Sequence, residues 1–140
     1  MSGWVGSARL RATLLDDAFL MQAAGTSTSS RGLRQNLAPL FRGPLKGRGP
    51  DYRTYAVQIW IEGLGRNDRI DVDNIGKACL DALTGLVWRD DRQVVRLSIE
   101  KLATETPRIT LAAEPAEVRS GSQDLAGWLR RADEPNAGRS

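Results

Sequence analysis

The stretch from Arg69 to Val95 reads R-I-D-V-D-N-I-G-K-A-C-L-D-A-L-T-G-L-V-W-R-D-D-R-Q-V-V. Its middle part has the three-then-four spacing of apolar residues that predicts one buried face of a helix. We expect the carboxylate of Asp73 to cap the start of this helix and Gly85 to end it. The apolar positions are Ile75, Ala78, Cys79, Ala82, Leu83 and Leu86.

Acidic residues flank the predicted helix. Asp71 and Asp73 lie two apart just before it, and Asp90 and Asp91 follow it after a short turn. Lys77 comes four residues after Asp73, so the two side chains project side by side from the exposed face of the helix. We therefore expect the four carboxylates to lie near one another, with one lysine beside them.

Clustered carboxylates repel, so such a group needs access to water, protonation or a bound cation. The chain has no histidine and one cysteine, which leaves zinc and other soft metals almost without ligands. Oxygen ligands favour magnesium or manganese, which often bind phosphate oxygens at the same time. Asp71, Asp73 and Asp91 could hold one or two such ions, while Lys77 could stabilise charge on a phosphate oxygen. A D-x-D pair alone is a weak signal, because most such pairs are helix caps or solvated turns.

The same stretch resembles the signature of the RusA-type Holliday-junction resolvases, through D-x-D-N-x-x-K, then D-A-L-T, then D-D-x-Q-V. The resemblance implies a small, homodimeric, magnesium-dependent endonuclease of a kind often encoded by prophages, with manganese as a possible substitute. It implies metal ligands at Asp71, Asp73 and Asp91, with Asp90 as the other half of the paired acid, and a catalytic lysine at Lys77. The resemblance does not extend well to either end of the chain.

Positive charge gathers just upstream, between Arg31 and Ile70, where eight basic residues stand against three acidic ones. A solvated loop is the simpler interpretation of such a segment. The neighbouring acids favour a second one, in which these side chains hold DNA phosphates without regard to base sequence. The predicted DNA-binding residues are Arg42, Lys46, Arg48, Arg53, Arg66 and Arg69.

Alternating apolar residues predict the strands. The clearest is 54–62, and 93–101 and 108–112 are expected to be antiparallel neighbours. Residues 7–15 could form a first strand, and 14–24 could equally be a short helix. Amphipathic helices are predicted at 31–41 and 123–132. Trp88 is expected to be a hydrophobic plug behind the acidic turn.

We expect a single α/β (α+β) domain with a mixed sheet of about four strands and two main helices on one face, paired as a homodimer. The endonuclease-like domain would span residues 1–114, of which 1–30 diverge from the family. Residues 115–140 would be a partly disordered C-terminal extension. No apolar run could span a bilayer and no signal peptide is recognisable, so we expect a cytoplasmic protein without a membrane partner.

The resemblance implies a structure-selective endodeoxyribonuclease that resolves Holliday junctions by paired symmetric nicks, in DNA recombination and repair. Its partner would be branched, four-way DNA. The alternative is a catalytically inactive module that binds branched DNA, which the divergent N-terminus makes conceivable. A metal-dependent enzyme acting on sugar nucleotides is disfavoured by the absence of a nucleotide-binding glycine fingerprint.

Overall fold

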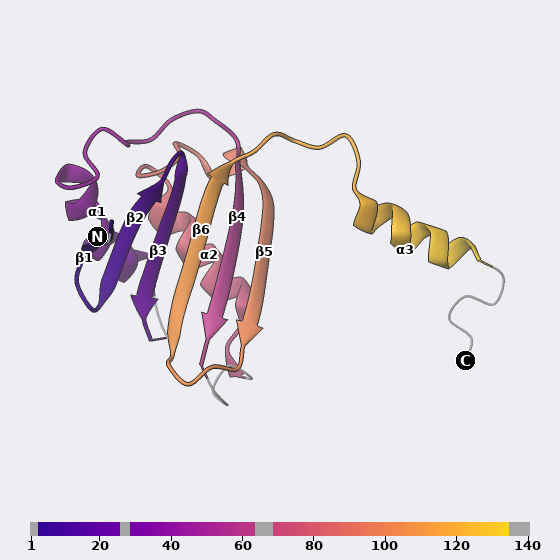
Figure 1. The fold of residues 1–140 in the computed structure, drawn as a ribbon, viewed down its shortest axis with the longest axis horizontal. Coiled ribbons are helices and arrows are strands. Elements are labelled where there is room, and N and C mark those ends of the chain that lie inside the picture. The colour runs from indigo at the N-terminus through magenta and orange to yellow at the C-terminus, as the bar shows by residue number, and fades with distance from the viewer. Residues whose placement is uncertain (1–2, 26–28, 64–68, 135–140) are drawn as a thin grey trace.

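The computed structural model describes residues 3–25, 29–63 and 69–134. Within these residues, six strands form one mixed sheet in the order β1-β2-β3-β6-β4-β5 (Figure 1). Neighbouring strands are antiparallel except for β4 and β5, which are parallel. The strands are β1 Val5–Gly6, β2 Leu10–Leu15, β3 Ala18–Ala24, β4 Tyr55–Glu62, β5 Val94–Leu102 and β6 Arg108–Pro115.

Helices α1 and α2 cover one face of this sheet, and α3 stands apart from it (Figure 1). Arg34 of α1 joins the first two helices by donating hydrogen bonds to the backbone carbonyls of Asp81, at 2.8 Å, and Thr84. None of these helices is long and apolar enough to cross a membrane. Their bounds are Ser30–Arg42 for α1, Val72–Leu83 for α2 and Gln123–Asp133 for α3.

The predicted single α+β domain with two main helices on one face is confirmed, but the sheet is larger than expected. The first strand considered for residues 7–15 is present as β2, and the two additional strands are β3, which forms a hairpin with β2, and β1, which pairs with the other edge of β2. The alternative of a helix over residues 14–24 is wrong. Alternate residues of β3, such as Phe19 and Met21, are buried against the helices, which is the two-residue period of a strand.

The core lies between the sheet and the first two helices. The strand predicted at 54–62 is confirmed as β4, and Tyr55, Val57, Ile59 and Ile61, which share one face of it, are all buried. Trp88 is also fully buried, with its ring centroid 5.6 Å from that of Tyr55. This packing fixes the turn that follows α2 against the start of β4.

The expected antiparallel pairing of β5 with β6 is wrong, because β4 lies between them. Ile59 of β4 pairs with Leu111 of β6 on one side and with Ile99 of β5 on the other. The crossover through α2 makes β4 and β5 parallel, since a helix returns the chain to the edge of the sheet where it started. The chain leaving β5 then turns back and adds β6 on the far side of β4.

Candidate functional site

The start of α2 is capped by Asp71 rather than by Asp73. The Asp71 carboxylate accepts a hydrogen bond from the backbone N–H of Asp73 at 2.9 Å, and the Asp71 carbonyl accepts one from the N–H of Ile75 at 3.2 Å. The predicted cap at Asp73 is therefore wrong by two residues, and Asp73 occupies the first turn instead. Both carboxylates are exposed, at the helix end where backbone dipoles favour negative charge.

The exposed face of α2 carries Asp73, Lys77 and Asp81, one helical turn apart, as the spacing predicts. Lys77 takes part in none of the ion pairs found within the described residues. Its ammonium group therefore has no structural partner there that a ligand would have to displace.

A groove of about 260 Å³ runs between α2 and the edge strand β5. Gly76 allows the two elements to approach, because a Cβ atom at this position would lie 2.5 Å from Ile99 Cδ1. The side of the groove formed by α2 is charged, while β5 contributes apolar side chains. The charged residues that line the groove are Asp73, Lys77, Asp81 and Asp91.

The second acidic pair has a structural role of its own. Asp90 caps the short 3₁₀ turn Asp91–Gln93 by accepting from the backbone N–H of Arg92 at 2.9 Å. The Arg92 guanidinium also donates to this carboxylate, at 3.2 and 3.1 Å, and these hydrogen bonds lower the pKa of Asp90. Asp91 is exposed. Asp90 is thus directed to Arg92 and not toward the start of α2.

The two acidic pairs do not converge within one copy of the chain, which corrects the expectation that four carboxylates meet. Asp71 follows the end of β4, whereas Asp91 precedes the start of β5, which pairs in parallel with the start of β4. The 12 residues of α2 lie between these two ends of the strands, and at about 1.5 Å per residue the helix is about 18 Å long, which separates Asp71 from Asp91. Among the described residues, no group of three or more acids, cysteines or histidines could hold a metal ion.

Magnesium in proteins is often bound by only one or two carboxylates together with water and phosphate oxygens. Asp71 and Asp73, exposed and adjacent in space, fit that mode of binding. They do not provide a three-carboxylate cage within one copy. Asp91 lies at the other end of the groove, too far from Asp71 and Asp73 to bind the same ion within one copy of the chain.

The basic loop between α1 and β4 lies beside Asp91 rather than beside Asp71. Gln93, which follows Asp91, donates from Nε2 to the backbone carbonyls of Asp51, at 2.8 Å, and Arg53, at 2.7 Å. Arg53 forms ion pairs with Asp51 at 2.8 Å and with Asp17 at 3.4 Å.

Arg48 belongs to this loop, and its side chain is 8% exposed. Its Nη2 donates to the hydroxyl of Tyr55 at 2.9 Å. We therefore leave Arg48 out of the proposed DNA surface, although the sequence placed it there. Arg66 lies outside the described residues, and Arg69 is exposed two residues before Asp71. Arg42 and Lys46 are in or next to the loop.

Two further arginines, Arg11 and Arg108, come together across the sheet although sequence reasoning did not select them. They lie on β2 and β6, and only the strand register brings them near each other, through β3. Neither belongs to a local motif, so no signal in the sequence alone could have paired them.

Comparisons with known proteins give a family match over the segment that contains the site, and two further similarities. The model of a family described as "Endodeoxyribonuclease RusA" matches residues 41–114. The uncharacterized protein YqaN of Bacillus subtilis (strain 168) is 49% identical over 39 residues, which are 28% of this chain and 28% of that protein's length. A crystal structure described as a putative translation initiation inhibitor from Salmonella typhimurium covers 81% of this chain and 96% of its own, with 10% identity and a TM-score of 0.39. A likeness of that size carries no argument about function.

Proposed function

This chain belongs to the RusA endodeoxyribonuclease family, and on that premise we propose that it is a magnesium-dependent endonuclease that resolves Holliday junctions by paired, symmetric nicks. The observation that carries the proposal is the exposed set Asp71, Asp73 and Lys77 on one side of the start of α2, inside the segment that matches the family. Its substrate would be four-way DNA, met in recombination and repair, in the cytoplasm.

Asp71 and Asp73 would hold a magnesium or manganese ion. Such an ion supplies Lewis-acid polarisation of the phosphodiester and stabilises the charge of the leaving oxygen. The hydrogen bond from the Asp73 N–H holds the Asp71 carboxylate in place before any ligand binds. Lys77, one turn along α2, would set its ammonium against a non-bridging phosphate oxygen and stabilise the negative charge that develops there.

Asp91 enters the proposal through a homodimer. An isologous dimer with two antiparallel copies of α2 sets the end of one helix beside the start of the other. The partner subunit's Asp91 would then reach the ion held by Asp71 and Asp73. Asp90, whose carboxylate is hydrogen-bonded to Arg92, would be the second carboxylate of that pair near the ion. Because the two acidic pairs are separated within one copy, Asp91 could share this ion only through a second copy of the chain. Two equivalent sites would also match the two opposing strands that must be cut.

The proposal is tested by nicking of a synthetic four-way junction with and without magnesium. We expect the parent chain to nick opposing strands only with magnesium or manganese, and Asp73→Asn to be at least about 100-fold slower. Glu100→Gln is the control, because it removes one exposed negative charge on β5 outside the groove. Equal losses in both variants would point to overall charge and contradict a specific role for Asp73.

Mixing two inactive variants tests the shared site. If a dimer shares its acids, a mixed dimer of Asp71→Asn with Asp91→Asn has one site with both changes and one site intact. Nicking of a single strand should therefore return on mixing. Continued inactivity, while each variant alone still binds the junction, would contradict sharing.

The second candidate function is a catalytically inactive module that binds branched DNA. The observation that favours it is the separation of the carboxylates within one copy. Under this alternative, the parent and Asp73→Asn would bind the junction without cutting it under any metal condition.

A further inference from the structure

A row of hydrogen-bonded side chains crosses β2, β3, β6 and β4 on the face of the sheet that α1 and α2 leave open. Arg11 Nε and Nη2 donate to Gln22 Oε1 at 3.0 and 2.6 Å, and Gln22 Nε2 donates to Thr110 Oγ1 at 3.2 Å. The Thr110 hydroxyl donates to Glu62 Oε2 at 2.6 Å, and Arg108 Nε donates to the same oxygen at 2.8 Å. An arginine therefore stands at each end of the row.

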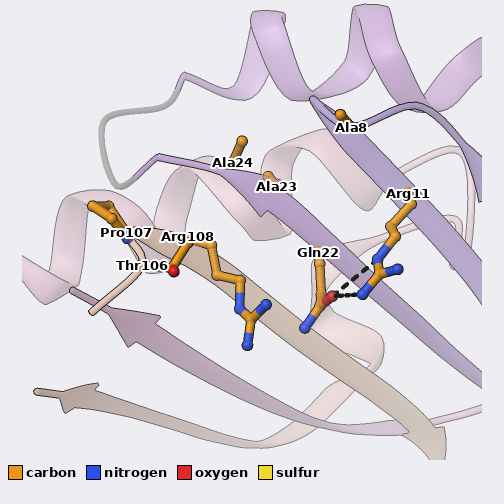
Figure 2. Close-up of a pocket in the computed structure, with 8 residues that line it drawn as sticks. All are labelled: Ala8, Arg11, Gln22, Ala23, Ala24, Thr106, Pro107 and Arg108. Carbon is orange, nitrogen blue, oxygen red and sulfur yellow. Dashed lines mark hydrogen bonds between the residues drawn. The ribbon is translucent and has the colours of Figure 1, made fainter. Parts of the chain in front are cut away.

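The two arginines border one hollow of about 230 Å³, with Gln22 between them (Figure 2). The other walls are mostly small or apolar, including Ala23, Ala24 and Pro107. None of the described residues that line this hollow is acidic. We call it the Arg11–Arg108 hollow.

Each guanidinium uses only part of its donor set in the row. Within the described residues, Arg11 makes no hydrogen bond from Nη1, and Arg108 makes none from either Nη atom. The Arg11 guanidinium also lies 4.2 Å from the ring centroid of Trp4, which restrains its orientation. The side chain of Arg108 is 40% exposed. Both arginines can therefore take an additional acceptor without breaking the row.

The charge of the row favours an anion. Two arginines stand against one carboxylate, that of Glu62, which is 8% exposed and turned toward Arg108 and Thr110. The planar donor forks of arginine match the oxygens of a phosphate better than a point charge does.

The hollow lies at the same edge of the sheet as the start of α2. Arg108 is opposite Ala24 of β3 and Glu62 of β4, the last residues of those strands, and α2 begins after β4 ends. From β3 to β5 is three strand spacings, or about 14 Å. That lateral offset alone corresponds to about four nucleotides at 3.4 Å per nucleotide of one strand, and the strand must also pass around this edge of the sheet, because the hollow and α2 lie on opposite faces.

We propose that the Arg11–Arg108 hollow binds a backbone phosphate of the DNA substrate, a few nucleotides from the bond to be cut. The hollow is a positioning site and takes no part in the chemistry. This inference rests on the proposed nuclease function, and it predicts a contact on the face opposite the groove between α2 and β5.

The test measures junction affinity against salt concentration for the parent, Arg11→Gln and Gln22→Glu. Removing one phosphate contact should reduce the slope of log K against log salt by about 0.9, which at 0.1 M salt means about eightfold weaker binding. Gln22→Glu is nearly isosteric and places a carboxylate against Arg11, so it should weaken binding similarly. Gln58→Glu is the matched control, because Gln58 lies on β4, is exposed on the same face of the sheet as Gln22, and is outside the hollow.

With saturating protein, both hollow variants should nick the junction at the parent rate, because neither residue touches the reacting atoms. An unchanged salt slope in Arg11→Gln and Gln22→Glu, with normal nicking, would contradict phosphate binding in the hollow. It would leave the nuclease proposal unaffected. An equal loss in Gln58→Glu would also overturn it, since overall charge would then be the cause. A parent chain that neither binds nor nicks the junction would overturn both proposals. If Arg11→Gln does not fold, Gln22→Glu decides alone.

Discussion

Glu62 and Arg108 are directly opposite each other on β4 and β6, and Arg108 Nε donates to Glu62 Oε2 at 2.8 Å. This hydrogen bond is the main cause that lowers the pKa of Glu62 below its ordinary value of 4.5. Burial opposes the effect and the hydrogen bond from Thr110 adds to it. The ionised carboxylate is therefore more stable in the folded chain than in the unfolded one.

Stability should depend on pH through this pair. A carboxyl group with a lowered folded pKa contributes fully above its unfolded pKa, and the contribution is lost as pH falls through the folded pKa. Glu62→Gln should reduce the free energy of unfolding by about 2 kcal/mol at pH 7, and the difference from the parent should shrink at pH 3. Urea unfolding at the two pH values measures this, with Glu100→Gln on the exposed side of β5 as the control. A difference that stays constant with pH would contradict the role given to ionised Glu62.

Trp88 should be one of the most sensitive positions for stability. Its side chain is fully buried against Tyr55, and its indole N–H donates to Thr84 Oγ1 at 3.1 Å. Trp88→Ala should cost about 3–5 kcal/mol, as for other large aromatic side chains truncated in a core. Trp128→Ala should change stability by less than about 0.5 kcal/mol, because this side chain is 66% exposed. Equal effects at the two tryptophans in urea unfolding would be the contrary result.

The local elements were predictable because their burial follows short-range periods. Ile75, Cys79, Ala82 and Leu83 recur at helical spacing, and all are buried in α2. The inward-facing residues of β4 occur at every second position, which is the period of a strand. The helix cap was misplaced because two aspartates, Asp71 and a second two residues later, both suit a cap and only backbone geometry distinguishes them.

The position of the acidic pairs depended on the direction of β5, which is a long-range property. A strand, a helix and a second strand in sequence favour a parallel pair with a crossover, and that pattern was present at 54–62, 72–83 and 94–102. Applying it would have placed Asp71 and Asp91 at opposite edges of the sheet. The burial of Arg48 had no comparable signal, because it depends on the contact of its loop with Tyr55.

Asp71 should have a structural and a chemical role that two substitutions separate. Asparagine caps a helix about as well as aspartate, so Asp71→Asn should keep the parent stability while losing magnesium-dependent nicking. Asp71→Ala should lose nicking and also about 1 kcal/mol of stability, because the Asp73 N–H then has no acceptor. Thermal unfolding and junction nicking on the same preparations give both values. Full nicking by Asp71→Asn would mean that Asp71 is a helix cap only.

The thiol of Cys79 should be unreactive while the chain is folded. Burial on the inner face of α2 raises its pKa to about 12, so the thiolate that reacts with disulfide reagents is almost absent at pH 8. A chromogenic disulfide should label the thiol only after urea is added, at the rate of unfolding. Rapid labelling of the native chain would mean that α2 separates readily from the sheet.

Removal of α3 should leave the stability of the domain unchanged. None of its residues is buried, and Leu125, Trp128 and Leu129 are 57%, 66% and 56% exposed. Within the described residues, the last hydrogen bonds between the chain and the sheet precede α3: the N–H of Ala116 donates to the Thr54 carbonyl at 2.8 Å, and the Glu117 carbonyl accepts from Arg96 at 3.3 Å. A chain ending at residue 118 should therefore unfold at the parent temperature.

A chain ending at residue 112 is the contrasting control, because it removes the end of β6 and the contact at Ala116. It should be clearly less stable, since buried Ala113 and several ladder hydrogen bonds are lost. Thermal unfolding followed by circular dichroism compares the three chains. A helix of 11 residues is marginal in water by itself, so removing α3 should reduce the helical signal by less than its length suggests. A lower unfolding temperature for the chain ending at residue 118 would mean that α3 packs on the domain, or on a second copy of it, and would contradict the expectation that this part of the chain is an extension outside the folded domain.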